Sequence, residues 1–111
     1  MNEHNDSVYF NHILDAINQT EEYLKDLDKE SFMEYPLARD GVIRQLEIIG
    51  EAAKNISDTT KELAPDVPWV EIVGMRNKLI HEYFGVDLDA VWETVQKDLP
   101  PLKKAVEKLL D

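Results

Sequence analysis

Four side chains with useful chemistry lie close together near residue 80: Arg76, Asn77, His81 and Tyr83. Arginine, amide and phenol groups can all donate hydrogen bonds to an anion, and histidine exchanges protons readily near neutral pH. A neutral imidazole can accept a proton from a hydroxyl nucleophile, while a fixed guanidinium stabilises charge that gathers on phosphate oxygens. The set therefore suits cleavage of RNA through its own 2′-hydroxyl, without a metal.

The spacing of apolar residues predicts that this set lies on a helix over residues 69–83. At 100° per residue, Arg76 falls in the middle of the apolar arc, with Tyr83 two turns on and almost in line. Asn77 and His81, four residues apart, share the flank of the helix. Burying an unpaired guanidinium is costly, so Arg76 requires either a paired anion or an open cleft.

A purely structural interpretation accounts for the same residues. Arg76 would form an ion pair with Glu47 or Glu51 of the preceding long helix, His81 would be a boundary residue, and Tyr83 would be a core aromatic. A lone arginine favours this interpretation, because buried ion pairs are often structural. The convergence of four polar groups on one edge favours a site.

The elements that must position these residues are helices. Apolar positions recur at helical spacing almost throughout, which predicts an all-α protein, a small antiparallel bundle of four main helices. The predicted helices cover residues 6–28, 37–56, 69–83 and 88 to the end. Small residues in the second helix (Gly50, Ala52 and Ala53) indicate that another helix packs closely there. Pro100 and Pro101 are expected to kink or break the last helix.

Local signals mark the ends of these elements. Ser31–Glu34 and Thr59–Glu62 have the spacing of capping boxes and predict short helical turns. Pro36 separates the first of these turns from the second long helix. Pro68 is placed to open the third helix, Gly85 to end it, and Asp87 to cap the fourth.

Length and composition predict one domain covering residues 1–111. The chain has no cysteines, which excludes disulfides, thiolate zinc sites and cysteine nucleophiles. We expect neither a cofactor nor a metal site, with His4 a solvated residue of the N-terminal tail and His12 exposed on the first helix. The sequence shows no signal-peptide pattern and no apolar run near the ~20 residues that span a bilayer, so we expect a cytoplasmic protein that does not contact membranes.

The net charge of −11 argues against tight binding to nucleic-acid duplexes, because proteins that track phosphates usually carry a basic face. DNA is therefore not an expected partner. A single-stranded RNA can still enter one local basic cleft. The acidic surface elsewhere is expected to attract a protein with a basic face.

Three segments of the sequence carry a resemblance to a known family. The octet R-N-K-L-I-H-E-Y at residues 76–83 resembles the signature of HEPN-domain toxins of the HepT type. The stretches RQLEIIGEAAKNI, PWVEIVGMRNKLIHEYFGVD and VWETVQKDLPPLKKAVEKLL look like the corresponding HepT segments, in the same order. The resemblance covers roughly residues 8–110.

This resemblance implies a HEPN-like homodimer in which both copies of the motif face a shared cleft. It implies a metal-independent endoribonuclease, the toxin of a type II toxin–antitoxin pair, with Arg76 and His81 as catalytic residues and Asn77 as a supporting contact. It further implies that Tyr83 is adenylylated, and the toxin silenced, by an MntA-type nucleotidyltransferase antitoxin, in a complex that can assemble further. Pairing of Glu51 with Arg76 is our own hypothesis, and Glu51 is a possible supporting residue.

A homodimer would also explain why Arg76 lies within an apolar arc, if that arc faces the symmetry mate. Two alternatives stay open. The chain could be a non-catalytic helical binding subunit of a nucleotidyltransferase complex, which would tolerate loss of the His81 imidazole. It could also be a purely structural dimerisation bundle, in which Arg76 matters for folding more than for activity.

Overall fold

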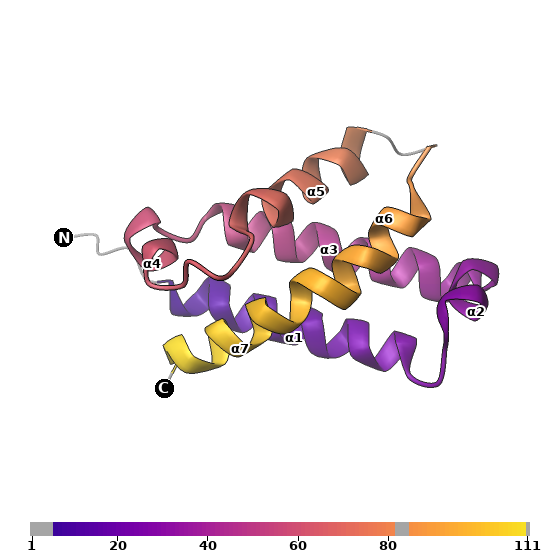
Figure 1. Ribbon diagram of the computed structural model, residues 1–111, viewed down its shortest axis with the longest axis horizontal. Coiled ribbons are helices and arrows are strands. Elements are labelled where there is room, and N and C mark those ends of the chain that lie inside the picture. Colours follow the sequence, from indigo (N-terminus) through magenta and orange to yellow (C-terminus); the bar gives the residue numbers. More distant parts are fainter. Residues whose placement is uncertain (1–5, 82–84, 111) are drawn as a thin grey trace.

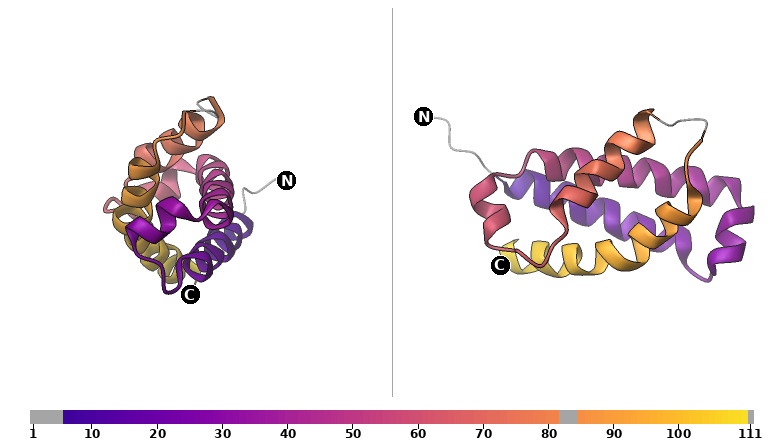
Figure 2. Two further views of the ribbon diagram at one scale, coloured as in Figure 1. Left: turned by 90° about the vertical axis from the view of Figure 1, so that its right-hand side faces the viewer. Right: turned by 45° about the horizontal axis from the view of Figure 1, so that its top comes forward.

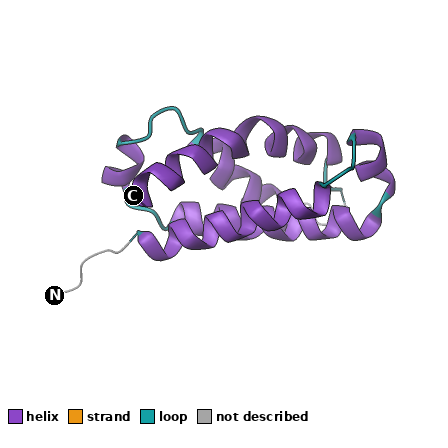
Figure 3. Ribbon diagram, turned by 90° about the horizontal axis from the view of Figure 1, so that it is seen from below, coloured by secondary structure: helices purple, strands orange, loops and turns teal. Residues whose placement is uncertain are grey.

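Every regular element of the computed structural model is helical within residues 6–81 and 85–110, the part of the chain that the structure describes (Figures 1 and 3). The all-α prediction is thus confirmed for this part, where none of the helices is long and apolar enough to cross a membrane. In chain order the elements are α1 (Ser7–Leu24), α2 (Lys29–Glu34), α3 (Pro36–Lys54), α4 (Asp58–Glu62), α5 (Trp69–His81), α6 (Leu88–Glu93), the π-helical segment η1 (Thr94–Asp98) and α7 (Leu99–Leu110).

The long elements run back and forth along the longest axis of the molecule. α1 packs against α3, α3 against α5, and α7 against α1, and consecutive long segments run in opposite directions (Figure 1). Helices α6, η1 and α7 follow one another as a continuous rod. The short helices α2 and α4 lie at opposite ends, and the end-on view in Figure 2 shows the long elements surrounding a common core.

The core is formed by the apolar stripes that the sequence shows at helical spacing. Fully burying one such side chain contributes about 1.5–3 kcal/mol, so these stripes fix which face of each helix turns inward. The largest fully buried side chains are Phe32, Ile13, Ile17, Ile49, Leu102, Val42, Val91, Val106 and Thr20. The hydroxyl of Thr20 donates to the backbone carbonyl of Ala16, which satisfies this polar group inside the core.

The first helix is shorter than predicted, because α1 ends at Leu24 and Asp26 adopts a positive φ of 65°. This left-handed residue turns the chain toward α2. The N-cap of α2 is Asp28, whose carboxylate accepts the backbone N–H of Ser31 at 2.8 Å. Hydrogen bonds from the backbone and side chain of Ser31 hold the pKa of Asp28 below its ordinary value.

Two of the predicted caps are therefore displaced. Ser31 lies inside α2 instead of starting a turn, and α4 is capped by Ser57, whose hydroxyl accepts the N–H of Thr60. Asp87 does cap α6, by accepting the N–H of Ala90 at 3.2 Å.

The predicted break at Pro100 and Pro101 is wrong, since the chain stays helical from residue 88 to residue 110. The wider turn of η1 lies just before the prolines, and the N–H of Leu99 bonds to the carbonyl of Thr94, five residues back. The prolines then occupy the first turn of α7. Proline is tolerated in the first turn of an α-helix, and here the wider turn of η1 comes directly before it.

Candidate active site

Helices α3 and α5 approach each other closely at Gly50. A Cβ atom built on Gly50 would lie 2.4 Å from the Cβ of Arg76 and 3.2 Å from the carbonyl oxygen of Ile72. No side chain fits in this space. Close packing at the Gly50–Ala53 segment, as predicted, is confirmed, and it places Arg76 directly against α3.

The guanidinium of Arg76 is held by two acceptors. Its Nε lies 2.7 Å from Oε2 of Glu51, and its Nη1 donates to Oδ1 of Asn77 at 3.2 Å. The Arg76 side chain is 24% exposed and that of Glu51 is 52% exposed. The hypothesised pair with Glu51 is present, whereas Glu47 pairs with Arg44 at 3.6 Å.

The apolar arc of α5 faces the core of its own protomer. Ile72 and Leu79 are buried at 3% and 2% exposure, and Val73 packs against the same core. The described part of this arc is thus covered by the chain's own core and not by a symmetry mate, whereas Phe84 and the side chain of Ile80 lie outside the described residues. Arg76 tolerates its place on the arc because Glu51 of α3 pairs with it and because the guanidinium reaches solvent.

Arg76 and Glu51 both line an open groove of about 550 Å³. The other lining residues come from α1 and from α3, except Asn55, the residue that caps the end of α3. They are Tyr9, His12, Arg44, Glu47, Ile48, Ala52 and Asn55. His12 is exposed, as predicted. The sequence did not predict that His12 would line the same groove as Arg76. Nothing in the sequence alone relates a residue on α1 to one on α5, because their proximity depends on how both helices pack against α3.

The remaining predicted site residues lie at or beyond the end of α5. His81 is the last residue of this helix, five positions after Arg76, and its side chain lies outside the described residues. Asn77 and His81 are four positions apart on the same continuous helix. Tyr83 and His4 also lie outside the described residues.

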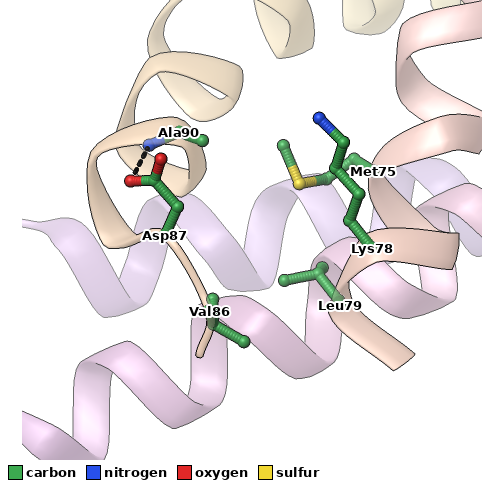
Figure 4. A pocket seen from close by; sticks show the side chains of 6 residues that line it. All are labelled: Met75, Lys78, Leu79, Val86, Asp87 and Ala90. Atoms are coloured by element: carbon green, nitrogen blue, oxygen red, sulfur yellow. Dashed lines mark hydrogen bonds between the residues drawn. The ribbon is translucent and has the colours of Figure 1, made fainter. Parts of the chain in front are cut away.

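The C-terminal part of α5 and the start of α6 line a small pocket together. Figure 4 shows Met75, Lys78 and Leu79 of α5 facing Asp87 and Ala90 across a small pocket of about 130 Å³, with Val86 at its base. Leu79 of α5 is buried in the core, and Asp87 caps α6 on the far side of the pocket.

Taken together, these contacts define a helical protein with an oriented guanidinium at a groove, an arrangement suited to an anion. A carboxylate and an amide orient one guanidinium at the edge of a groove, on the helix that also carries His81. Within the described ranges, no three His, Asp or Glu side chains are grouped closely enough to hold a metal ion.

Comparison with known families agrees with this description. The family model described as ribonuclease HepT-like matches residues 13–109, and the chain belongs to this family. It is similar to the "Probable ribonuclease HepT" of Thermococcus cleftensis, with 48% identity over 91% of this chain and 92% of that protein. A "Putative RNase" of Methanocaldococcus jannaschii is 47% identical over 86% of this chain and 87% of its own length.

One further relative is a longer protein. A "Gamma-glutamylcyclotransferase and putative RNase" of M. jannaschii is 45% identical over 94% of this chain, and the chain spans 47% of its length. No solved structure matches the chain.

Proposed function

We propose that this protein is a metal-independent endoribonuclease, the toxin of a type II toxin–antitoxin pair, in which Arg76 and His81 carry the chemistry. The observation that carries the proposal is the fixed position of Arg76, paired with Glu51 at 2.7 Å beside an open groove and on the same helix as His81. Membership of the ribonuclease HepT-like family supports the class of reaction.

The proposed reaction is an internal phosphoryl transfer within the RNA. The His81 imidazole accepts the proton of a 2′-hydroxyl, and the 2′-oxygen attacks the adjacent phosphorus. The bond from phosphorus to the 5′-oxygen breaks, leaving a 2′,3′-cyclic phosphate on one product. The departing 5′-oxygen takes up a proton and becomes a hydroxyl on the other product, so that the protons balance. General base catalysis of this kind contributes roughly 10²–10⁴-fold.

Arg76 stabilises the charge that develops on the phosphate oxygens. A guanidinium has five N–H donors, and the contacts with Glu51 and Asn77 use two of them. These contacts fix the orientation of the group before RNA binds, which reduces the reorganisation needed in the transition state. We assign Asn77 as a supporting residue and Glu51 as a positioning residue.

We further propose that the whole chain forms a single HEPN-like four-helix domain and that two copies form a homodimer. Val70, at the start of α5, is 81% exposed. A large apolar side chain this accessible on the helix that carries the site is consistent with contact to a second copy. An isologous contact there would bring two sites together.

An MntA-type nucleotidyltransferase is the proposed antitoxin, acting by adenylylation of Tyr83. An adenylate near the end of α5 would add a phosphate that competes with RNA for Arg76 and would occlude the site. Replacing Tyr83 with Phe should leave RNA cleavage intact while abolishing modification, which mass spectrometry after incubation with ATP and the antitoxin measures. Loss of cleavage in a folded Tyr83→Phe protein would contradict this role.

The acidic surface of the chain, with a net charge of −11, is proposed to attract a basic face of the antitoxin. The affinity of the two proteins should then fall as salt rises from low to physiological concentration. An affinity that is indifferent to salt in this range would exclude the electrostatic attraction.

The decisive test is incubation of RNA with purified protein in excess chelator. Wild type should cleave, and His81→Ala should be slower by roughly 10²–10⁴-fold with an unchanged melting temperature. The matched control is Lys78→Ala, which removes an exposed side chain from the same helix and should cleave like wild type. Absence of cleavage by wild type, together with normal binding of the nucleotidyltransferase by His81→Ala, would instead support a non-catalytic binding subunit.

A further inference from the structure

We propose that the groove beside Arg76 is a nucleotide subsite for single-stranded RNA, with Tyr9 and His12 contacting a base and Arg44 contacting a phosphate next to the one that Arg76 holds. This inference rests on the proposed ribonuclease function and specifies how the substrate is held. It adds residues from α1 and α3 to a site so far confined to α5 and Glu51.

The groove offers a surface on which a base can stack. The rings of Tyr9 and His12 lie 6.5 Å apart and nearly perpendicular, at 86°, so their faces point in different directions. Both residues line the groove, together with the apolar side chains of Ile48 and Ala52. Unpaired RNA bases bind proteins by stacking on aromatic side chains and on guanidinium planes.

The same groove offers two cations to the RNA backbone. Arg44 and Arg76 both line it, and the Arg44 side chain is 70% exposed. The ion pair of Arg44 with Glu47 is long, at 3.6 Å, and exposed. Such a pair contributes only about 0–1 kcal/mol, so a phosphate can take the place of the carboxylate.

Local charge does not oppose a polyanion at this groove, although the protein as a whole is acidic. Its lining holds two arginines and two glutamates, so their formal charges cancel, whereas the whole chain carries −11. The volume of about 550 Å³ lies within the usual range of small-molecule sites, roughly 300–1,000 Å³. This volume is large enough for one nucleotide of a single strand.

The test measures binding separately from cleavage. A short, fluorescently labelled single-stranded RNA with every 2′-hydroxyl replaced by fluorine cannot be cleaved, and its affinity is followed by fluorescence anisotropy. Tyr9→Leu keeps apolar bulk where Tyr9 packs against the core but removes the ring, and should weaken binding roughly tenfold. Tyr9→Phe should retain binding, and His12→Ala should weaken it. Tyr35→Ala, at an exposed tyrosine beside α2, is the matched control and should bind normally.

Arg44→Gln should weaken binding and lower the slope of log affinity against log salt by about 0.7, the value for one phosphate contact on a single strand. Lys104→Gln removes the same charge from an exposed position on α7 and should leave this slope unchanged. Equal slopes in the two variants would overturn the role of Arg44.

The outcomes separate this proposal from the ribonuclease proposal. If wild type cleaves ordinary RNA but the Tyr9, His12 and Arg44 variants bind the fluoro-RNA as wild type does, the subsite is wrong and the nuclease stands. If these variants weaken binding but wild type cleaves nothing, the groove binds RNA and the nuclease is wrong. A variant whose oligomeric state changes, by light scattering, would assign the groove to a subunit contact and overturn the subsite.

Discussion

Two polar clusters in this molecule have similar side chains but different surroundings. At the α4 end, the Asp6 carboxylate accepts hydrogen bonds from the backbone N–H of Ser57 at 3.2 Å, the Ser57 hydroxyl at 2.8 Å and the Thr60 hydroxyl at 2.5 Å. These contacts join residues more than fifty positions apart. On the α3–α5 face, Glu51 and Asn77 hold the guanidinium of Arg76.

The difference lies in what each cluster leaves available to a ligand. Around Asp6, the hydroxyls and the N–H have acceptors inside the cluster, so it contributes stability. Around Arg76, two of the five guanidinium N–H donors are used, and Arg76 lines an open groove. A polar cluster closed on itself holds the fold, whereas one held from one side only can bind a substrate. Substitutions that affect stability and activity separately test this distinction.

The largest effect is expected from Gly50→Val, because it alters the fold and the site together. The new side chain would collide with the Cβ of Arg76 and push α5 away from α3. We expect a loss of about 3 kcal/mol in unfolding free energy. Displacing Arg76 by about 1 Å should also reduce cleavage roughly 10²-fold. Denaturant melts and initial rates measure the two effects.

Gly74 provides the matched control for this substitution. It lies in α5, but nothing is within 4 Å of a Cβ built on it, so Gly74→Val should change stability by less than about 0.5 kcal/mol. Equal effects at the two glycines would contradict the close approach at Gly50. A destabilised Gly74→Val protein alone would show that another molecule packs on that side of α5.

The second largest effect is expected from Asp6→Ala, and it should act on stability alone. The change removes the acceptor shared by Ser57 and Thr60 and should lower the unfolding free energy by about 1–3 kcal/mol. Cleavage at a temperature where the variant remains folded should equal that of wild type. Asp58→Ala serves as the control, because Asp58 is an exposed aspartate of α4, the short helix that also contains Thr60. An Asp6→Ala protein of normal stability but reduced activity would reverse the roles of the two clusters.

The sequence predicted the parts of this fold that depend on local periodicity. The apolar stripes located α1, α3 and α5, and the small residues around Gly50 indicated the close helix contact. Caps were harder, because a Ser or Thr followed three residues later by Glu fits several registers. Backbone geometry decided in favour of Asp28 and Ser57, and a wide turn at η1 allowed the helix to continue at the prolines.

The candidate site likewise has a part that the sequence predicted and a part that it did not. The arginine, the amide and the histidine are recognisable on one helix from their spacing, and an acidic partner for Arg76 was expected on the preceding long helix. The groove was not predictable, because Tyr9 and His12 reach it from α1 only after α1 and α5 have both packed on α3. A helical wheel also shows which arc of α5 is apolar without showing what covers it. For the described part of this arc, the structure shows that the chain's own core does.

The smallest effect is expected from Glu51→Gln, and it should act on activity alone. Gln keeps an oxygen that can accept the Nε–H of Arg76 but removes the charge, so the guanidinium stays oriented while its pairing weakens. We expect kcat to fall by no more than a few-fold, whereas Glu51→Ala, which frees the guanidinium, should lower kcat about tenfold. Both variants should leave KM for RNA unchanged or lower, because removing a carboxylate reduces repulsion of phosphate. If the carboxylate served only to neutralise Arg76, both variants would instead cleave faster than wild type, and the arginine would need no positioning.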